Sequence, residues 1–214
     1  MPDRDFGPVG RDAGTQVRAG NAMSALAALR SATWPSHQRL EKRLDIKARF
    51  TEAGAYRAHL ERMWGFCAAL ERRLAPGAFA GALEDFDSRR KLPLLTQDLV
   101  ALGLEPESVA RLPCCPDLPA CADPASAFGC AYVLEGATLG GRTLLPLVQS
   151  RLGLTAERGA AFLASYGENV AAMWHTFGAA LDVCCARPER RAAAAAAAVV
   201  TFDALEAWLV GSAA

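Results

Sequence analysis

The chain of 214 residues carries 23 basic and 23 acidic residues and has no formal net charge, which argues against a general nucleic-acid binder, because such proteins carry a basic surplus. Its length suits one or two domains, and 52% hydrophobic but only 7% aromatic residues favour packed helices over a β-sandwich. The apolar segment AAAAAAAVV (192–200) is too short to span a membrane and predicts a buried helix. We therefore expect neither a membrane nor a nucleic-acid partner.

The first residues of the chain are polar, rich in glycine and mixed in charge. They predict a disordered N-terminal arm over 1–21, followed by one domain over 22–214. The arm lacks the apolar segment of a secretory signal, and the seven cysteines are an odd number. Both features predict reduced thiols and a cytoplasmic protein. The segment PCCPDLPAC (113–121) could offer thiolates to a metal, but it lacks the Cys-x-x-Cys pair of a typical zinc site.

Helical patterns cover most of the remaining chain, in the order 24–45, 51–74, 89–102, 124–151, 155–185 and 188–210. The sequence shows no alternating pattern of the kind that predicts strands. Prolines divide the helical regions, so the expected fold is one all-α domain of about seven or eight helices. The segment 103–123, which holds four prolines, is expected to be mostly loop.

Single residues predict where these helices begin and bend. Pro35 indicates that the first helix either starts near Thr33 or bends there, because proline removes a backbone hydrogen bond inside a helix. Thr51 is the expected N-cap of the second helix. Pro146 is expected to interrupt the fourth helix, and Pro188 to open the last one, where its missing N–H would have no intrahelical partner in any case.

One face of the first helix holds a histidine among mainly apolar residues, at spacings of three or four: Leu29, Thr33, His37, Leu40 and Leu44. His37 is therefore expected to point inward. It is either a core histidine satisfied by a hydrogen bond or an axial ligand to a metal or a heme, because an imidazole in apolar surroundings tends to stay neutral. A ligating histidine usually donates its other N–H to an acceptor. Glu41, one turn on, could be that acceptor or a surface carboxylate.

The other two histidines are expected to lie outside any site. His59 has charged neighbours, and Leu60 is better placed for the core, so the prediction is a solvated His59. His175 points away from the face that Trp174 and Phe177 share at a spacing of three residues.

The segment YVLEGATLGG (132–141) has a helical pattern although it contains Gly136, Gly140 and Gly141. Each glycine inside a helix costs roughly 0.5–1 kcal/mol relative to alanine, so the three together need a physical reason. One reason is close packing of another element against a face without side chains. The other is the close approach of a flat ligand to the backbone, with a bend that leaves room above it. The residues alone leave both reasons open.

Four segments, taken in order, resemble the heme oxygenase family. LRSATWPSHQRLE (29–41) is similar to the N-terminal signature of that family. YVLEGATLGG is similar to the distal-helix signature of its bacterial, biliverdin-producing branch, which includes enzymes that accompany bacteriophytochromes. SYGENVAAMWHTF (165–177) and TFDALEAWL (201–209) resemble the last two helices. The resemblance covers roughly residues 24–210.

The resemblance implies a single-domain, multi-helical fold that holds heme between a proximal helix and a kinked distal helix. It implies that His37 binds the iron, and that the catalytic surface of the distal helix is formed by Gly136, Gly140 and Gly141. Bound dioxygen would then tilt toward one meso carbon of the porphyrin. Heme would be both substrate and cofactor, and the products would be biliverdin, ferrous iron and carbon monoxide.

The resemblance also implies contacts around the heme and partners for the reaction. Thr33 precedes His37 by one turn and Glu41 follows it by one turn. Arg30, two turns before His37, lies where the family places a basic residue that can bind a propionate. The other cofactor-binding residues expected are Trp174 and Phe177. Electrons would come from a ferredoxin, a flavoprotein reductase or ascorbate, and a bacteriophytochrome would receive biliverdin.

Two departures from the family pattern keep alternative functions open. Ala137 stands where mammalian members have an aspartate that orders waters near the iron, so Thr138 or Glu135 would have to contribute to the water network. Pro35 lies two residues before His37 and could shift the ligand. The alternatives are a heme-binding or heme-carrying protein without turnover, and a helical relative that has lost heme.

Overall fold

The structure, a computed structural model, describes residues 23–74 and 77–211, so the predicted arm over 1–21 lies outside the described residues. Its elements, in chain order, are α1 (Ala25–Leu44), α2 (Ile46–Arg49), α3 (Ala53–Arg73), α4 (Phe86–Arg89), α5 (Leu92–Ala101), α6 (Pro106–Val109), α7 (Pro124–Leu152), α8 (Ala161–Ala164), the 3-10 turn η1 (Gly167–Asn169), α9 (Val170–Cys184) and α10 (Pro188–Val210). Neither described range contains a strand. The expected all-α fold is confirmed.

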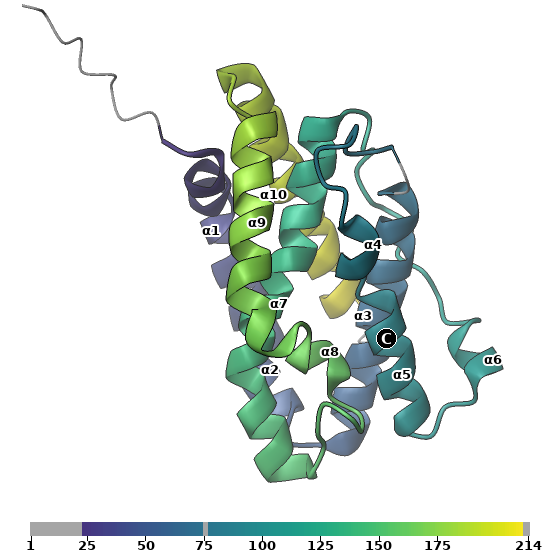
Figure 1. Cartoon of the computed structure of the whole chain (residues 1–214). Helices are drawn as coiled ribbons and strands as arrows, with labels where there is room; N and C mark the ends of the chain where they lie inside the picture. Colours follow the sequence, from purple (N-terminus) through teal and green to yellow (C-terminus); the bar gives the residue numbers. More distant parts are fainter. Residues whose placement is uncertain (1–22, 75–76, 212–214) are drawn as a thin grey trace, which may run out of the picture.

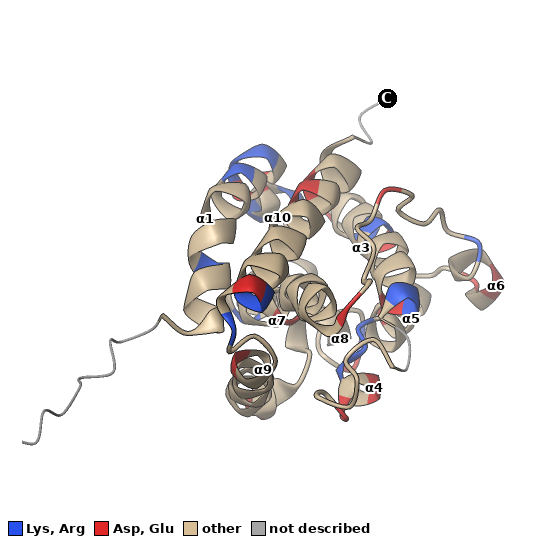
Figure 2. Cartoon of the chain, turned by 90° about the horizontal axis from the view of Figure 1, so that it is seen from above, with Lys and Arg blue, Asp and Glu red and all other residues tan. Residues whose placement is uncertain are grey.

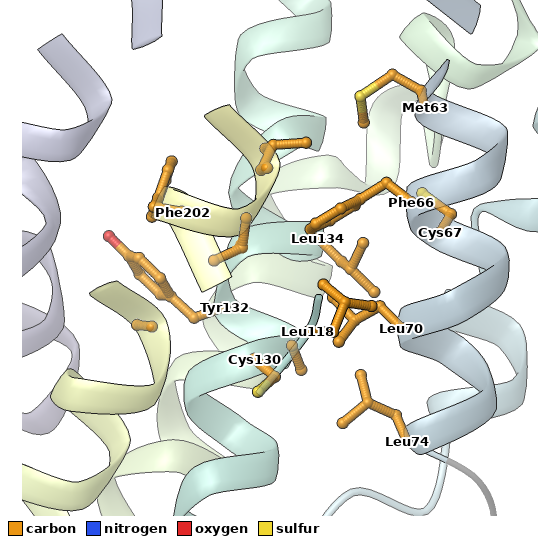
Figure 3. Packing of buried hydrophobic residues seen from close by; sticks show 14 of the residues in the cluster. Met63, Phe66, Cys67, Leu70, Leu74, Leu118, Cys130, Tyr132, Leu134 and Phe202 are labelled. Carbon is orange, nitrogen blue, oxygen red and sulfur yellow. The ribbon is translucent and has the colours of Figure 1, made fainter. Parts of the chain in front are cut away.

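The longer helices pack around α7, which runs through the middle of the bundle (Figure 1). This helix contacts α3, α8, α9 and α10. α10 also packs against α1, so the first and last helices of the chain are neighbours. α3 packs against α5 and α10, and Figure 3 shows side chains of α3, among them Phe66 and Leu70, meeting Leu134 of α7 in the core. The arrangement places α1 and α7, which carry the proposed site residues, on either side of α10.

Charged side chains join α1 to α10. The Arg39 guanidinium donates to Glu206 at 2.8 Å and to Asp203 at 2.6 Å, and Arg43 donates to the second carboxylate oxygen of Glu206 at 2.7 Å. Figure 2 shows these basic positions of α1 beside acidic positions of α10. Although burial acts in the opposite direction, hydrogen bonds from Arg43 and Arg39 keep the pKa of Glu206 below its ordinary value. The cluster fixes α1 against the body of the protein.

Two helices continue through their prolines. α1 begins after Ser24, whose hydroxyl accepts a hydrogen bond from a backbone N–H of the first turn at 3.1 Å, and it continues past Pro35. The alternative of a helix start near Thr33 is therefore wrong, and so is the expected interruption at Pro146, which lies inside α7. The N-cap prediction for Thr51 is also wrong, because its hydroxyl donates to the last turn of α2 at 2.7 Å and makes no bond to α3.

The predicted long helix over 155–185 is the main error in the helix assignments. The structure divides this region into α8, η1 and α9. Gly159, Ser165 and Gly167 have φ angles of 84°, 47° and 58°, and an α-helix requires a φ near −60°. The chain reverses direction at these residues, which places α8 beside α7 instead of in line with α9.

The last helix, α10, is long and apolar enough to cross a membrane by length and composition alone. In the structure it packs against α1 and α7, and Ala194, Ala198 and Thr201 are completely buried. The prediction of a buried helix for the alanine-rich segment is therefore only partly correct: one face of the helix is buried, whereas Ala192, Ala193, Ala196 and Val200 are exposed. Pro188 lies in the first turn as expected.

Candidate functional site

A cavity of about 700 Å³ lies between α1 and α7, and we call it the α1–α7 cavity. Its volume falls within the range of small-molecule sites, about 300–1,000 Å³. Most of its lining is apolar and comes from these two helices, with further residues from α3, α8, α9, α10 and the segment around α2. The polar and charged residues that line it are Ser24, Arg30, Thr33, His37, Glu41, Lys47, His59, Tyr132 and Thr143.

His37 lines the cavity from α1, and its side chain is 45% exposed. Its ring lies nearly parallel to that of Trp34, with centroids 6.0 Å apart, and meets Phe202 edge-on at 5.9 Å. Nδ1 is buried, makes no hydrogen bond to any described residue and lies 3.7 Å from the Glu41 carboxylate. A core histidine would be satisfied by a hydrogen bond. His37 thus lacks the hydrogen bond that a core histidine would make, and its ring lines the cavity.

The three glycines between Gly136 and Gly141 all line the α1–α7 cavity, but they have two different environments. A Cβ atom added at Gly136 or Gly140 would meet nothing within 4 Å. A Cβ at Gly141 would lie 2.6 Å from the backbone oxygen of Leu163 in α8. The two reasons for glycine in this helix thus apply to different residues: open space for a ligand at the first two, and close packing against α8 at the third.

Neither of the polar neighbours of Ala137 faces the cavity. Ala137 lines it, whereas Glu135 and Thr138 are both 3% exposed and form no part of the lining. The Thr138 hydroxyl donates to the backbone oxygen of Glu135 at 2.7 Å. The expectation that Glu135 or Thr138 contributes to a water network in the cavity is therefore wrong, because the helical register turns both side chains into the core.

Glu135 instead holds a buried ion cluster behind α7. Its carboxylate accepts hydrogen bonds from Arg89 at 2.9 Å, from Lys91 at 3.0 Å and from the Tyr166 hydroxyl at 2.7 Å. Arg89 also donates to Thr176 of α9 at 2.8 Å. Burial lowers the pKa of Lys91, and the nearby Glu135 charge opposes that change. The cluster attaches α7, at the residue before Gly136, to α4, α9 and the start of α5.

Most of the residues expected to contact the ligand line the cavity, but one of them does not. Arg30, Thr33 and Trp174 line the cavity together with His37 and Glu41. The Phe177 ring is completely buried between Phe128 and Trp174 and does not line the cavity. Phe177 is therefore a core residue, which corrects its expected role in cofactor binding.

Lys47, in the single turn α2, is a second cation on the cavity lining. Sequence periodicity could not reveal it, because a turn of four residues has no periodic pattern. With Arg30 it provides two exposed positive charges at the cavity.

His59 lies in a different environment from the one that the sequence predicted. The prediction of a solvated side chain is wrong: His59 is 6% exposed and lines the cavity from α3. Its ring meets Phe50 edge-on at 5.0 Å, and Nδ1 makes no hydrogen bond to any described residue. Burial, with a smaller contribution from the Arg49 charge, lowers the pKa of His59 to about 4. His175 is exposed on α9, as predicted.

Within residues 23–74 and 77–211, no group of three or more histidine, cysteine or acidic residues is arranged to hold a metal ion. A metal at His37 would therefore need its other ligands from a molecule such as a porphyrin. The cavity fits such a molecule, since it combines an unpaired imidazole, an apolar lining and two glycines without neighbouring atoms.

Comparison with known proteins gives the same fold. The NO- and CO-bound heme oxygenase from Neisseria meningitidis superposes with a TM-score of 0.74 at 23% identity, over 90% of this chain and 95% of that chain. The heme oxygenase from Leptospira interrogans gives a TM-score of 0.71 at 19% identity, over 88% of this chain and 100% of that chain. No curated protein sequence matches significantly. The sequence profile of the heme oxygenase family, however, matches residues 23–210, and the chain therefore belongs to the heme oxygenase family.

Proposed function

We propose that this protein is an active heme oxygenase, which uses dioxygen and electrons to cleave heme to biliverdin, ferrous iron and carbon monoxide. One observation carries the proposal: the unpaired imidazole of His37 and the backbone at Gly136 and Gly140, free of side chains, line the same cavity. Family membership supports the general class of reaction, and this geometry supports turnover by this chain.

His37 would bind the iron of the substrate through Nε2, because Nδ1 is the ring nitrogen near Glu41. At 3.7 Å the Glu41 carboxylate makes no direct hydrogen bond to this nitrogen. Through a bridging water it would orient the imidazole, as acceptors beside ligating histidines commonly do. A neutral histidine ligand gives globin-like ligation, in contrast to the thiolate ligation that favours O–O cleavage in other heme enzymes.

The substrate would lie with one face against α7 at Gly136 and Gly140. The absence of side chains there leaves open space beside the helix backbone, which would let the porphyrin approach the helix closely. This chain would thus place the substrate so that dioxygen reacts at the porphyrin edge, near a meso carbon. The protein thus contributes mainly position and orientation, since the reactive group belongs to heme itself.

Arg30 and Lys47 are the proposed partners of the heme propionates. Both are exposed on the cavity lining, and a guanidinium can bind a carboxylate through two hydrogen bonds. Trp174 would contact the porphyrin from α9, next to Tyr132, whose ring centroid lies 5.8 Å away. This arrangement would orient the carboxylates toward solvent and the apolar porphyrin edge inward.

The electrons for the reaction would come from a ferredoxin, a flavoprotein reductase or ascorbate. We propose a cytoplasmic location, since all seven cysteines are free, as expected in a reducing compartment. The similarity of YVLEGATLGG to the bacteriophytochrome-associated branch also makes a bacteriophytochrome the proposed receiver of biliverdin.

The decisive experiment adds hemin to the purified protein, records the Soret band and then supplies ascorbate. We expect a Soret band followed by the verdoheme and biliverdin spectra. A stable Soret band without product would show a heme-binding protein instead, and no Soret band would show a relative that has lost heme. His37→Ala should abolish the ligated spectrum and exposed His175→Ala should not, so an unchanged Soret band in His37→Ala would reject the assignment of the ligand.

A further inference from the structure

The part of α7 that lines the cavity from Gly136 to Leu144 offers no free polar side chain. Gly136, Ala137 and Gly140 have none, and the Thr143 hydroxyl already donates to the backbone oxygen of Gly140 at 2.8 Å. Glu135 and Thr138 face the core. A reaction that consumes protons beside this part of α7 therefore needs a hydrogen-bonding group from elsewhere in the cavity lining.

His59 of α3 is the buried polar side chain that lines the cavity without a partner. Its ring meets Phe50 edge-on at 5.0 Å, and Met63, Phe162 and Leu163 line the same cavity. The His59 side chain is 6% exposed, and Nδ1 has no hydrogen-bond partner among the described residues. Buried polar groups are nearly always hydrogen-bonded, to protein or to an ordered water. The cavity that His59 lines is a place from which such a partner can come.

We propose that His59 binds an ordered water inside the α1–α7 cavity and thereby supplies a hydrogen-bonding group that the part of α7 from Gly136 to Leu144 lacks. A buried water needs two to four polar partners. Here His59 provides one, and the helix backbone left accessible at Gly136 and Gly140 lines the same cavity.

The chemistry of the imidazole suits this role. Burial keeps its pKa at about 4, so near neutral pH the ring is uncharged, with one nitrogen that donates and one that accepts a hydrogen bond. Such a ring can hold a water in either orientation and keep it in position while the water transfers a proton. The step from water binding to proton delivery rests on the proposed heme oxygenase function. In that function His59 is a positioning residue, because it acts through the water.

The water can be tested without heme. Crystals of the ligand-free protein should show an ordered water within hydrogen-bond distance of a His59 nitrogen, and crystals of His59→Leu should lack it. In protein with ¹⁵N-labelled histidine, the His59 nitrogens should report a neutral ring at pH 6. A His59 imidazole with no water and no other polar contact in those crystals would overturn the proposal, whether or not the protein turns heme over.

The role in the reaction is tested with hemin, carbon monoxide and ascorbate on three variants. His59→Leu removes the polar group at similar volume, His59→Gln retains hydrogen-bonding atoms, and His175→Leu is the exposed control. We expect His59→Leu to shift the C–O stretching frequency of the ferrous carbon monoxide complex and to slow biliverdin formation roughly tenfold to a hundredfold, with both restored in part by His59→Gln. An unchanged C–O frequency in His59→Leu would overturn the role even if turnover fell. If none of the variants or the parent binds hemin, the proposed function fails and the crystallographic test of the water still decides the inference.

Discussion

The cavity side and the core side of α7 differ in what they place next to the helix backbone. On the cavity side, Gly136 and Gly140 leave open space, with nothing within 4 Å of a Cβ atom added at either residue. On the core side, Glu135 is surrounded by two buried cations, and Gly129 and Gly141 are in contact with the backbones of α10 and α8. One side of α7 is thus held in place by ion pairs and close packing, whereas the other side is open to the cavity.

This difference shows that glycine in a helix has no single meaning. At Gly129 and Gly141 the missing side chain allows two backbones to pack closely, so it contributes to stability. At Gly136 and Gly140 the missing side chain contributes nothing to packing, and the helix is less stable there than with alanine. We therefore predict opposite effects for the same substitution on the two sides.

The largest effect is expected for Glu135→Leu. Removing this carboxylate leaves Arg89 without one of its two acidic partners and the Lys91 ammonium without its ion pair, although both side chains are 1% exposed. Loss of one partner from a buried ion pair typically costs 3–5 kcal/mol, so we expect the free energy of unfolding to fall by about that amount. Chemical denaturation measures it, with Asp87→Asn, which removes an 80% exposed carboxylate, as control. If both variants lost the same free energy of unfolding, the ion cluster around Glu135 would not hold the core side of α7 in place.

The next effect concerns pH and His59. Because the folded pKa of His59 is about 4 and the unfolded value is 6.5, the unfolded chain takes up a proton that the folded chain excludes. The contribution of the neutral His59 to the free energy of unfolding should therefore be complete above pH 6.5. It should be lost as the pH falls toward 4, by at most about 3 kcal/mol. The pH dependence of the free energy of unfolding should be flatter in His59→Leu. Asp98, whose pKa is raised to about 6 mainly by burial, changes stability in the opposite direction but equally in both proteins. Parallel pH profiles of the two proteins would show that folding does not lower the pKa of His59.

A smaller loss is expected for Gly129→Ala on the core side. The new Cβ would overlap the backbone oxygen of Ala194 and lie 2.9 Å from the Cβ of Ala197. Overpacking of this kind costs about 1–3 kcal/mol, because α7 and α10 must move apart. Thermal unfolding followed by circular dichroism measures the change. A variant as stable as the parent would mean that the contact between the two helices adjusts freely.

The smallest change in stability, with the opposite sign, is expected for Gly140→Ala. Nothing lies near the new methyl group, so the helix should gain about 0.5–1 kcal/mol from the better helix former. The same methyl group would enter the space proposed for heme, so the affinity for hemin should fall or the Soret maximum should shift. Hemin titration and thermal unfolding of the same sample separate the two effects. A destabilised variant would reject the description of this side as open space.

The sequence was sufficient for helices that are covered mainly on one side. The periodic pattern located α1 and α10 within a residue or two, and it placed Leu29, Thr33 and Leu44 on the buried side of α1. It also located α3 within two residues, but it did not predict the burial of His59 in this helix, where every residue from Met63 to Glu71 is buried as well. A helix covered on several sides has no single apolar stripe, and so the pattern could not show that His59 also faces inward.

The sequence by itself determined the all-helical class, the face of the first helix that carries His37 and the presence of Gly136, Gly140 and Gly141 in one helix. Only the tertiary structure decided which of those glycines has open space beside it, because that depends on whether α8 or the cavity lies next to the position of the missing Cβ atom. It also decided that Glu135 belongs to the core and His59 to the cavity. Periodicity gives the direction of a side chain relative to its own helix, whereas the packing of the other helices determines what the side chain meets in that direction.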